Sequence, residues 1–204
     1  MEPDLIIGST VGADATVDSY DQLSEIAPTI MLDYGAHTWE DLAVTLGEAT
    51  GAEDGVQVAL DDFEAYVDEA AASLTLPGQT ATALAYNGAD GGGVFSAESS
   101  QAAILIGLGF DYVVGPEDLA DQVRSDVSFF TAENLPAALA NPEVVFVIAG
   151  GDEQADSLVN DPLLANTPAV ANGQVYATGP TSFRIDYYSG KQMIDAIVAG
   201  LGGE

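Results

Sequence analysis

Apolar residues in the first part of the chain fall into two short continuous runs with a helix-spaced stretch between them. The runs at 4–9 and 29–34 are typical of buried strands. In 19–28 the apolar residues recur at helical spacing, and Pro28 ends the pattern. A strand, a helix and a strand in this order predict a βαβ unit, which favours a parallel sheet.

The pattern then becomes helical over 39–76, where apolar residues recur at three- and four-residue steps. Gly51 and Gly55 indicate a break or kink inside this stretch. Thr38 is a candidate N-cap, with Asp41 at the reciprocal capping position. We therefore expect a helical connector after the βαβ unit.

A second α/β section follows the connector. Apolar runs predict strands at 82–86, 111–115, 127–131, 143–150 and 174–179, helices at 97–109, 132–139 and 186–201, and a glycine-rich loop at 87–95.

These elements predict an α/β fold of two lobes, with parallel-type sheets joined by a long helix. We expect a remnant of an N-terminal α/β lobe at 1–38, a connecting helical region at 39–76 and a C-terminal α/β lobe at 77–204. Because the chain opens almost directly on a strand, we expect the first lobe to be truncated and part of a longer protein to be missing.

Charge restricts the partners. The chain has 33 acidic residues against three basic ones, which gives a formal net charge of −30. Such a surface repels phosphate backbones and anionic membranes, so neither nucleic acid nor a membrane surface is an expected partner. A surface so depleted in positive charge also indicates a salt-rich environment, where charges are strongly screened.

Catalytic machinery is scarce. The chain has no cysteine and one histidine, His37, which we interpret as a loop residue with a cleft contact as the alternative. The loop at 87–95 lacks the Lys-Ser/Thr of a P-loop, and no serine-hydrolase, metalloprotease or calcium-loop motif is present. We therefore expect no enzyme activity, no catalytic residues and no metal bound by the protein.

The two arginines stand out against this acidic background. Arg184 lies among Phe183, Tyr187 and Tyr188, and Arg124 lies in "DQVRSDVSFF". Each arginine could form a salt bridge with a surface acid. The alternative is recognition of an anionic aromatic ligand, because a guanidinium supplies charge, a rigid set of donors and a planar face for stacking.

Several segments together carry a family resemblance. "EPDLIIGS", "YDQLSEIAPTIMLDY", "WEDLAVTLGEATG", "SAESSQAAILIGLGF", "NDPLLANTPAVANGQVYATG" and "SFRIDYYSGKQMID" occur in the order expected of one family. Over essentially all of its length, the chain resembles the periplasmic ferric-enterobactin (iron-siderophore) binding proteins of ABC importers. The resemblance implies two lobes joined by a rigid long helix. It also implies capture of a ferric catecholate siderophore and its delivery to a membrane permease.

The resemblance also assigns candidate ligand contacts. Arg184 falls on the arginine of the family's FR-DYYS motif, and Arg124 on the arginine before the "ENL" helix. Phe95 stands where the family carries a pocket tryptophan, so the ring is kept and the indole N–H is lost. Tyr187 and Trp39 complete the candidate set.

The ligand supplies a physical reason for keeping two arginines. A ferric tris-catecholate is an anion with flat aromatic rings, so a strongly acidic protein needs local cations to bind it. The iron is already saturated by the siderophore, and neither a protein metal ligand nor a cofactor is implied. Lys191, one turn further along the last helix, is expected to be a surface residue.

Other readings stay open. A related importer component could bind a hydroxamate siderophore or another iron chelate, haem or cobalamin. A siderophore hydrolase is disfavoured by the single histidine, and a truncated fragment could fold without binding a ligand. We expect a monomer in the periplasm or outside the cell, associated with the cell envelope, with any signal or lipid-anchor region outside this chain.

Overall fold

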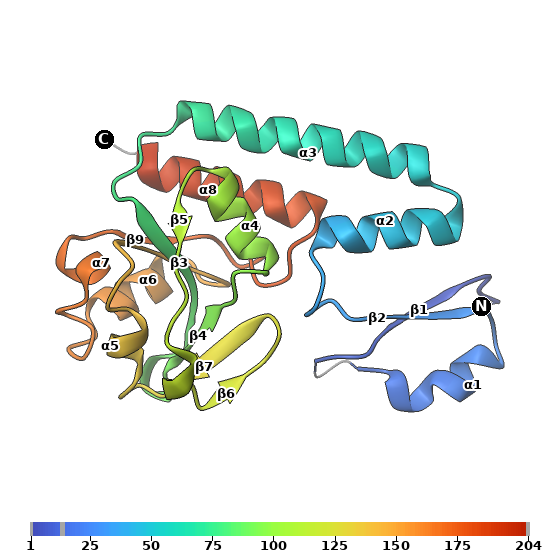
Figure 1. The fold of residues 1–204 in the computed structure, drawn as a ribbon, viewed down its shortest axis with the longest axis horizontal. Coiled ribbons are helices and arrows are strands. Elements are labelled where there is room, and N and C mark those ends of the chain that lie inside the picture. Colours follow the sequence, from blue (N-terminus) through green and yellow to red (C-terminus); the bar gives the residue numbers. More distant parts are fainter. Residues whose placement is uncertain (1, 13–14, 203–204) are drawn as a thin grey trace.

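The computed structural model describes residues 2–12 and 15–202, which form two unequal α/β parts connected by helices (Figure 1). In the smaller part, β1 (Ile6–Ser9) pairs in parallel with β2 (Thr29–Leu32). The turn η1 (Val17–Ser19) and helix α1 (Tyr20–Ser24) lie between these strands. The predicted βαβ unit is therefore confirmed.

The connection between the two parts is a pair of helices, α2 (Trp39–Thr50) and α3 (Glu53–Ser73), both inside the helical region expected at 39–76. Thr38 caps α2 by accepting a hydrogen bond from the Asp41 N–H at 3.4 Å. The chain reverses at Gly51, whose φ of +69° is favourable for glycine. The predicted break is thus a full turn between two packed helices (Figure 1).

The larger part is built on a seven-stranded sheet with the order β6-β7-β4-β3-β8-β9, and β5 pairs with β3 beside this path. The strands are β3 (Thr80–Tyr86), β4 (Gly92–Phe95), β5 (Asp111–Tyr112), β6 (Gln122–Val123), β7 (Val127–Phe130), β8 (Val144–Val147) and β9 (Val175–Ala177). Strands β5, β3, β8 and β9 are parallel, as expected, whereas β4, β7 and β6 add an antiparallel half.

The antiparallel half corrects the prediction of a glycine-rich loop at 87–95. A short turn, η2 (Gly88–Asp90), leads into β4, which folds back on β3. Gly91 has φ +87°, and a Cβ there would lie 2.0 Å from the carbonyl oxygen of Phe130. The glycines therefore allow strands to pair closely. The sequence predicted a loop here because glycine is also common in loops.

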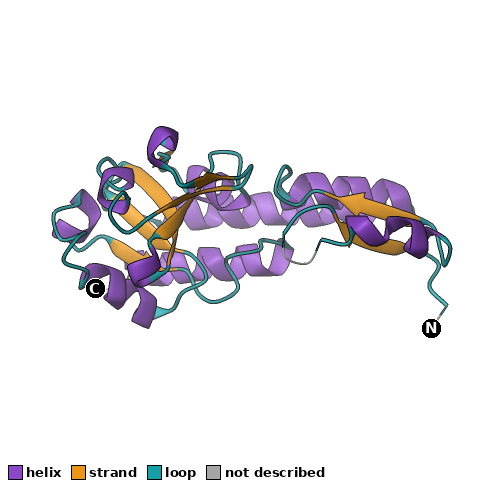
Figure 2. Cartoon of the chain, turned by 90° about the horizontal axis from the view of Figure 1, so that it is seen from below, coloured by secondary structure: helices purple, strands orange, loops and turns teal. Residues whose placement is uncertain are grey.

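Helices cover both faces of this sheet. They are α4 (Ser100–Gly107), α5 (Leu135–Ala138), α6 (Asp152–Val159), α7 (Pro168–Ala171) and α8 (Tyr187–Gly202), with a further turn η3 (Glu117–Leu119). Helices α6 and α7 were not predicted. In α6 only Ala155 and Leu158 are buried, so its apolar pattern is too sparse to be recognised. Seen from below, the two sheets lie toward opposite ends of an elongated molecule (Figure 2).

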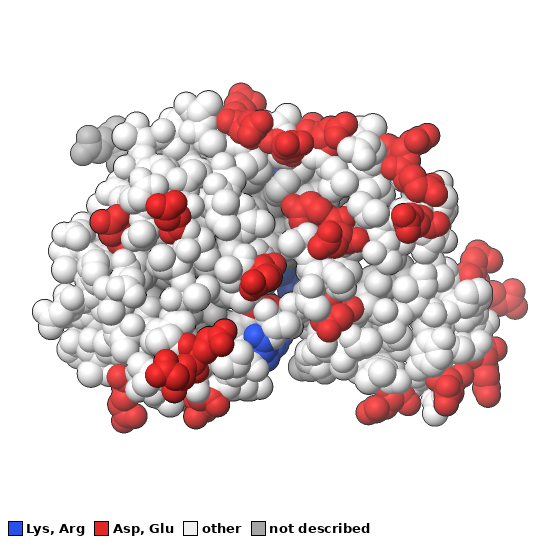
Figure 3. All heavy atoms as spheres, in the orientation of Figure 1, with Lys and Arg blue, Asp and Glu red and all other residues white. Residues whose placement is uncertain are grey.

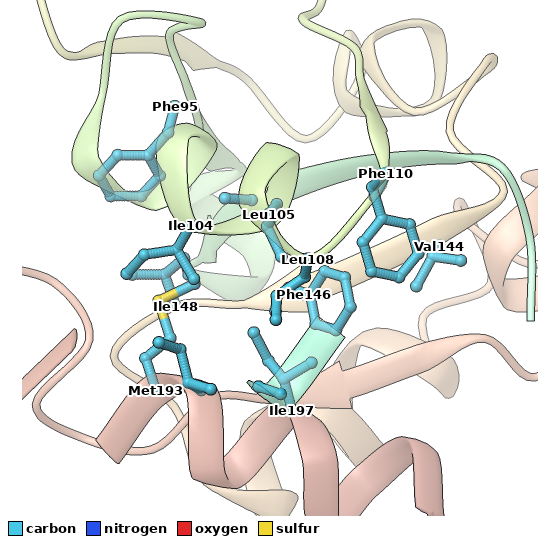
Figure 4. Close-up of a cluster of buried hydrophobic side chains, with 14 of the residues drawn as sticks. Phe95, Ile104, Leu105, Leu108, Phe110, Val144, Phe146, Ile148, Met193 and Ile197 are labelled. Carbon is cyan, nitrogen blue, oxygen red and sulfur yellow. The ribbon is translucent and has the colours of Figure 1, made fainter. Parts of the chain in front are cut away.

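The core follows the two-residue period of the strands. In β8, Val144 and Phe146 face α3, α4 and α8, while Val145 and Val147 face α5 to α7. Figure 4 shows Phe146 among Leu105, Leu108 and Ile197. The smaller part has no comparable core: in the described residues up to Thr38, only Ala27 is buried. The larger part therefore supplies the packed core that can hold the residues of a site in fixed positions.

Candidate functional site

A pocket of about 210 Å³ lies where the two parts meet. Its walls come from the segment after β2, the start of α2, the end of β4, the start of α4 and the loop before α8. The lining residues are Tyr34, Gly35, His37, Trp39, Leu42, Phe95, Glu98, Ser99, Ser100, Gln101, Asp126, Phe183, Arg184 and Ile185. In α/β folds, ligands commonly bind where strands end in loops of this kind.

Arg184 brings positive charge to this pocket from the loop between β9 and α8. Its Nη2 donates a hydrogen bond to the hydroxyl of Tyr34 at 3.4 Å. The guanidinium carbon also lies 5.0 Å from the centre of the Tyr34 ring, within range of a cation–π interaction. The side chain of Arg184 is exposed, so the candidate arginine is accessible from the pocket.

Buried and partly buried hydrogen bonds hold the loop that carries Arg184. The side-chain amide of Gln101 on α4 donates to the backbone carbonyls of Ser182 at 2.9 Å and Phe183 at 2.7 Å. The Ser182 hydroxyl in turn accepts from the N–H of Ala149 at 2.9 Å, just beyond β8. The loop is thereby fixed to both helix α4 and the carboxyl end of strand β8, which limits where the guanidinium can reach.

Aromatic side chains form the inner wall of the pocket. Phe95 is 2% exposed and makes an edge-to-face contact with Phe183, with the ring centres 5.7 Å apart. Trp39 is 8% exposed and packs in the same manner on Phe63 at 4.9 Å. The structure thus brings three of the predicted residues, Arg184, Phe95 and Trp39, to one pocket.

Arg124 lies beside this pocket instead of in its wall. It follows β6, and its Nη2 lies 3.0 Å from Oδ2 of Asp126. It lines an adjacent hollow of about 340 Å³ that shares Phe95 and Glu98 with the main pocket. Arg124 therefore forms a salt bridge with an acidic residue, which was one of the two roles considered for it. Its role as a ligand contact stays a prediction.

Tyr187 also turns away from the main pocket. Its hydroxyl donates a hydrogen bond to Asp62 on α3, and its ring packs against Trp39 with centres 6.2 Å apart. Tyr187 therefore supports the back of the Trp39 ring. It does not line the pocket that holds Arg184.

Lys191 lies at the surface, as expected, and its contacts with Asp62, Tyr66 and Tyr187 form a clasp between α8 and α3. Its ammonium group pairs with Asp62 and lies 4.6 Å and 4.4 Å from the ring centres of Tyr66 and Tyr187. Its side chain is 21% exposed. The hydrogen bonds from Lys191 and then Tyr187 lower the pKa of Asp62, and the bond to Asp62 raises the pKa of Lys191.

We expect Asp62→Asn to lower the urea midpoint of unfolding at pH 7, because it removes the partner of Lys191. The folded-state pKa of Asp62 is below its ordinary value of 3.8. Its contribution to stability is therefore present above pH 3.8 and lost as pH falls through the folded-state pKa. Urea titrations at pH 7 and in acid should show a difference between variant and wild type that shrinks in acid.

Asp61→Asn is the matched control, since Asp61 is the neighbouring acid on α3 and accepts a hydrogen bond from Gln57 of the same helix. We expect it to leave the urea midpoint nearly unchanged. Equal urea midpoints for Asp62→Asn and wild type at pH 7 would show that the ion pair between Lys191 and Asp62 does not stabilise the fold.

Tyr34 and Gln101 are among the pocket residues that were not predicted. Tyr34 reaches Arg184 across 150 positions of sequence, and Gln101 reaches the loop before α8 across 81 and 82 positions. The signal available for Tyr34 was its place at the carboxyl end of the predicted strand 29–34. His37 lies in the pocket wall, in agreement with its cleft-contact alternative.

The charge on the molecule is unevenly distributed. On the face shown in Figure 3, acidic side chains are spread over both parts, whereas basic atoms appear near the central hollow. Among the described residues, no group of three or more His, Cys, Asp or Glu side chains could hold a metal ion. None of the helices in the described ranges is both long and apolar enough to cross a membrane.

Comparison with known proteins agrees with this architecture. The periplasmic binding protein family matches residues 1–181. The ferric enterobactin-binding periplasmic protein FepB of Escherichia coli O6:H1 (strain CFT073) is 39% identical over 202 residues, which cover 97% of this chain. The Fe(3+)-citrate-binding protein YfmC of Bacillus subtilis (strain 168) is 28% identical over 86% of this chain.

Solved structures extend the comparison to the fold. The crystal structure of holo-ViuP superposes with a TM-score of 0.90 at 34% identity, covering 96% of this chain and 67% of that one. PiaA of Streptococcus pneumoniae TIGR4, solved in complex with ferrichrome, has a TM-score of 0.77 at 21% identity, covering 98% of this chain and 69% of that one, and supports the fold alone.

The chain is shorter than these relatives. It spans 63% of the length of FepB and 53% of the length of YfmC. The family match nevertheless covers most of this sequence, and the identity to FepB extends across nearly all of it. The chain belongs to the periplasmic binding protein family.

Proposed function

We propose that this chain binds a ferric siderophore of the catecholate type, such as ferric enterobactin, and delivers it to the permease of an ABC importer. The observation that carries the proposal is the placement of Arg184 at an aromatic-lined pocket of a protein with a net charge of −30. An anionic ligand needs such a local cation, and flat catechol rings suit walls formed by Phe95, Trp39 and Phe183.

The relatives support the same ligand class. FepB is described as a ferric enterobactin-binding protein, and YfmC as an Fe(3+)-citrate-binding protein. Both names refer to iron held in an anionic chelate. In this proposal the iron arrives inside the ligand, and the protein contributes charge, rings and hydrogen bonds without chemical conversion.

The cellular setting follows from the same proposal. A binding protein that feeds a permease works in the periplasm or at the outer surface of the cytoplasmic membrane, as a monomer that meets the permease transiently. Arg124 would add a second positive charge at the rim of the site if a ligand released it from Asp126, 3.0 Å away.

Fluorescence titration tests the proposal directly. Trp39 is the sole tryptophan of the sequence and lies in the pocket wall, so a bound ferric complex should quench its emission. We expect saturable quenching by ferric enterobactin at sub-micromolar concentration in high salt, with weaker binding of ferrichrome, haem and cobalamin. Stronger quenching by one of these three would assign the site to that ligand. No quenching by any of the four would overturn the proposal.

A further inference from the structure

The pocket as it stands is small for the ligand proposed above, and this inference rests on that proposed function. Its volume is about 210 Å³, whereas pockets for drug-sized ligands have about 300–1,000 Å³. A ferric complex with three catechol groups around the metal is at least of drug size. The pocket in this geometry is therefore smaller than such a ligand.

The segment 33–37 contributes Tyr34, Gly35 and His37 to the pocket wall. It links β2 to α2 and is braced internally by Asp33, whose Oδ1 accepts from the N–H groups of Gly35 at 2.9 Å and Ala36 at 3.1 Å. Gly35 packs against the turn before β7, where an added Cβ would lie 2.9 Å from Oγ of Ser125. The segment thus contacts Arg184 through Tyr34 and lies against Ser125 at Gly35.

Tyr34 makes with Arg184 the contacts that a catecholate would make. Its ring lies 5.0 Å from the guanidinium carbon, and its oxygen accepts a hydrogen bond from Nη2 at 3.4 Å. A catechol group has the same ring and an oxygen in the same relation to it. The ligand and Tyr34 therefore require the same face and donor of one guanidinium.

We propose that Tyr34 is an internal substitute for a catecholate ring, which occupies Arg184 in the unliganded protein and is displaced, with segment 33–37, when the siderophore binds. Tyr34 thus lowers the affinity for the siderophore by competing with it for the guanidinium of Arg184. A ligand without an oxygen-bearing aromatic ring lacks the groups that replace Tyr34 on Arg184, so the exchange also favours catecholates over other iron chelates.

The first arm of the test compares affinities for ferric enterobactin by quenching of Trp39. Tyr34→Leu removes the competing ring and is expected to bind about three- to tenfold more tightly than wild type. Tyr34→Phe keeps the ring and loses the hydroxyl, so its gain should be smaller. Tyr20→Leu, a change of the same kind at an exposed tyrosine on α1, should bind as wild type does.

The second arm follows the segment itself. The sequence has no cysteine, so Ala36→Cys and Ser157→Cys, both at exposed positions, accept spin labels at these sites alone. Gallium(III) enterobactin, a diamagnetic counterpart of the ferric complex, should change the distance between the labels in the wild-type background. In the Tyr34→Leu background, the distance distribution should already be broader before ligand is added.

The outcomes separate this inference from the function on which it rests. Binding that is tighter in Tyr34→Leu than in wild type, together with a ligand-dependent distance between the labels, supports it. If wild type binds but Tyr34→Leu binds equally or more weakly, or if the distance does not change, the inference is wrong and the function stands. If neither protein binds ferric enterobactin, the proposed function fails, and the inference fails with it.

Discussion

Arg184→Ala is expected to weaken the binding of ferric enterobactin by about 10- to 150-fold. A hydrogen bond to a charged group contributes about 1.5–3 kcal/mol, which corresponds to this range. The effect should appear in affinity and not in stability, because the side chain is exposed and its loop is held by Gln101 and Ser182. Trp39 quenching measures the affinity, and urea titration measures the stability.

Two variants make this result specific. Arg184→Lys keeps the charge but loses the planar guanidinium, so it should retain part of the affinity. Lys191→Gln removes the same charge from the clasp between α8 and α3, away from the pocket, and should leave the affinity close to that of wild type. An affinity of Arg184→Ala within twofold of wild type would contradict the assignment of Arg184 as a ligand contact.

The contrast between Arg184 and Arg124 shows what sequence can predict about a site. Both arginines were recognised because they are rare in an acidic chain and fall on family positions. The sequence did not show that Asp126, two residues away, would pair with Arg124. It also did not show that Tyr34, at a distance of 150 positions, would contact Arg184. The Tyr34 contact depends on how loops from separate elements meet, which no local pattern encodes. The Asp126 pair depends on the conformation of the turn between β6 and β7.

The fold was more accessible than the site because burial leaves periodic patterns. The run at 143–150 predicted a buried strand, and β8 is buried on both faces as a central strand should be. The glycines at 91–93 were misread because glycine marks turns and close strand contacts alike. Tyr187 is outside the main pocket for a related reason: its neighbours in sequence indicated the pocket, but in the first turn of α8 its hydroxyl bonds to Asp62. Its role toward a ligand stays a prediction.

The position of Arg184 depends on a residue that carries no charge. Gln101 is 4% exposed, and its amide supplies donors to two backbone carbonyls of the loop before α8. In Gln101→Leu, the side chain keeps a similar size but both carbonyls lose this donor. Because a buried polar group left unpaired costs about 1–3 kcal/mol, we expect a loss of about 2–4 kcal/mol in the free energy of unfolding.

The same substitution should also weaken the binding of ferric enterobactin, because the loop would no longer hold the guanidinium at the pocket. Gln192→Leu is the matched control: Gln192 is exposed on α8 and accepts a hydrogen bond from Thr181 in the same loop. It should change the urea midpoint and the affinity little. If Gln101→Leu destabilises the protein but binds the ligand as wild type does, then the bonds of Ser182 to Ala149 and Gly179 are sufficient to position Arg184. In that case Gln101 stabilises the fold without positioning Arg184, and the loop before α8 is held in place at the carboxyl end of β8.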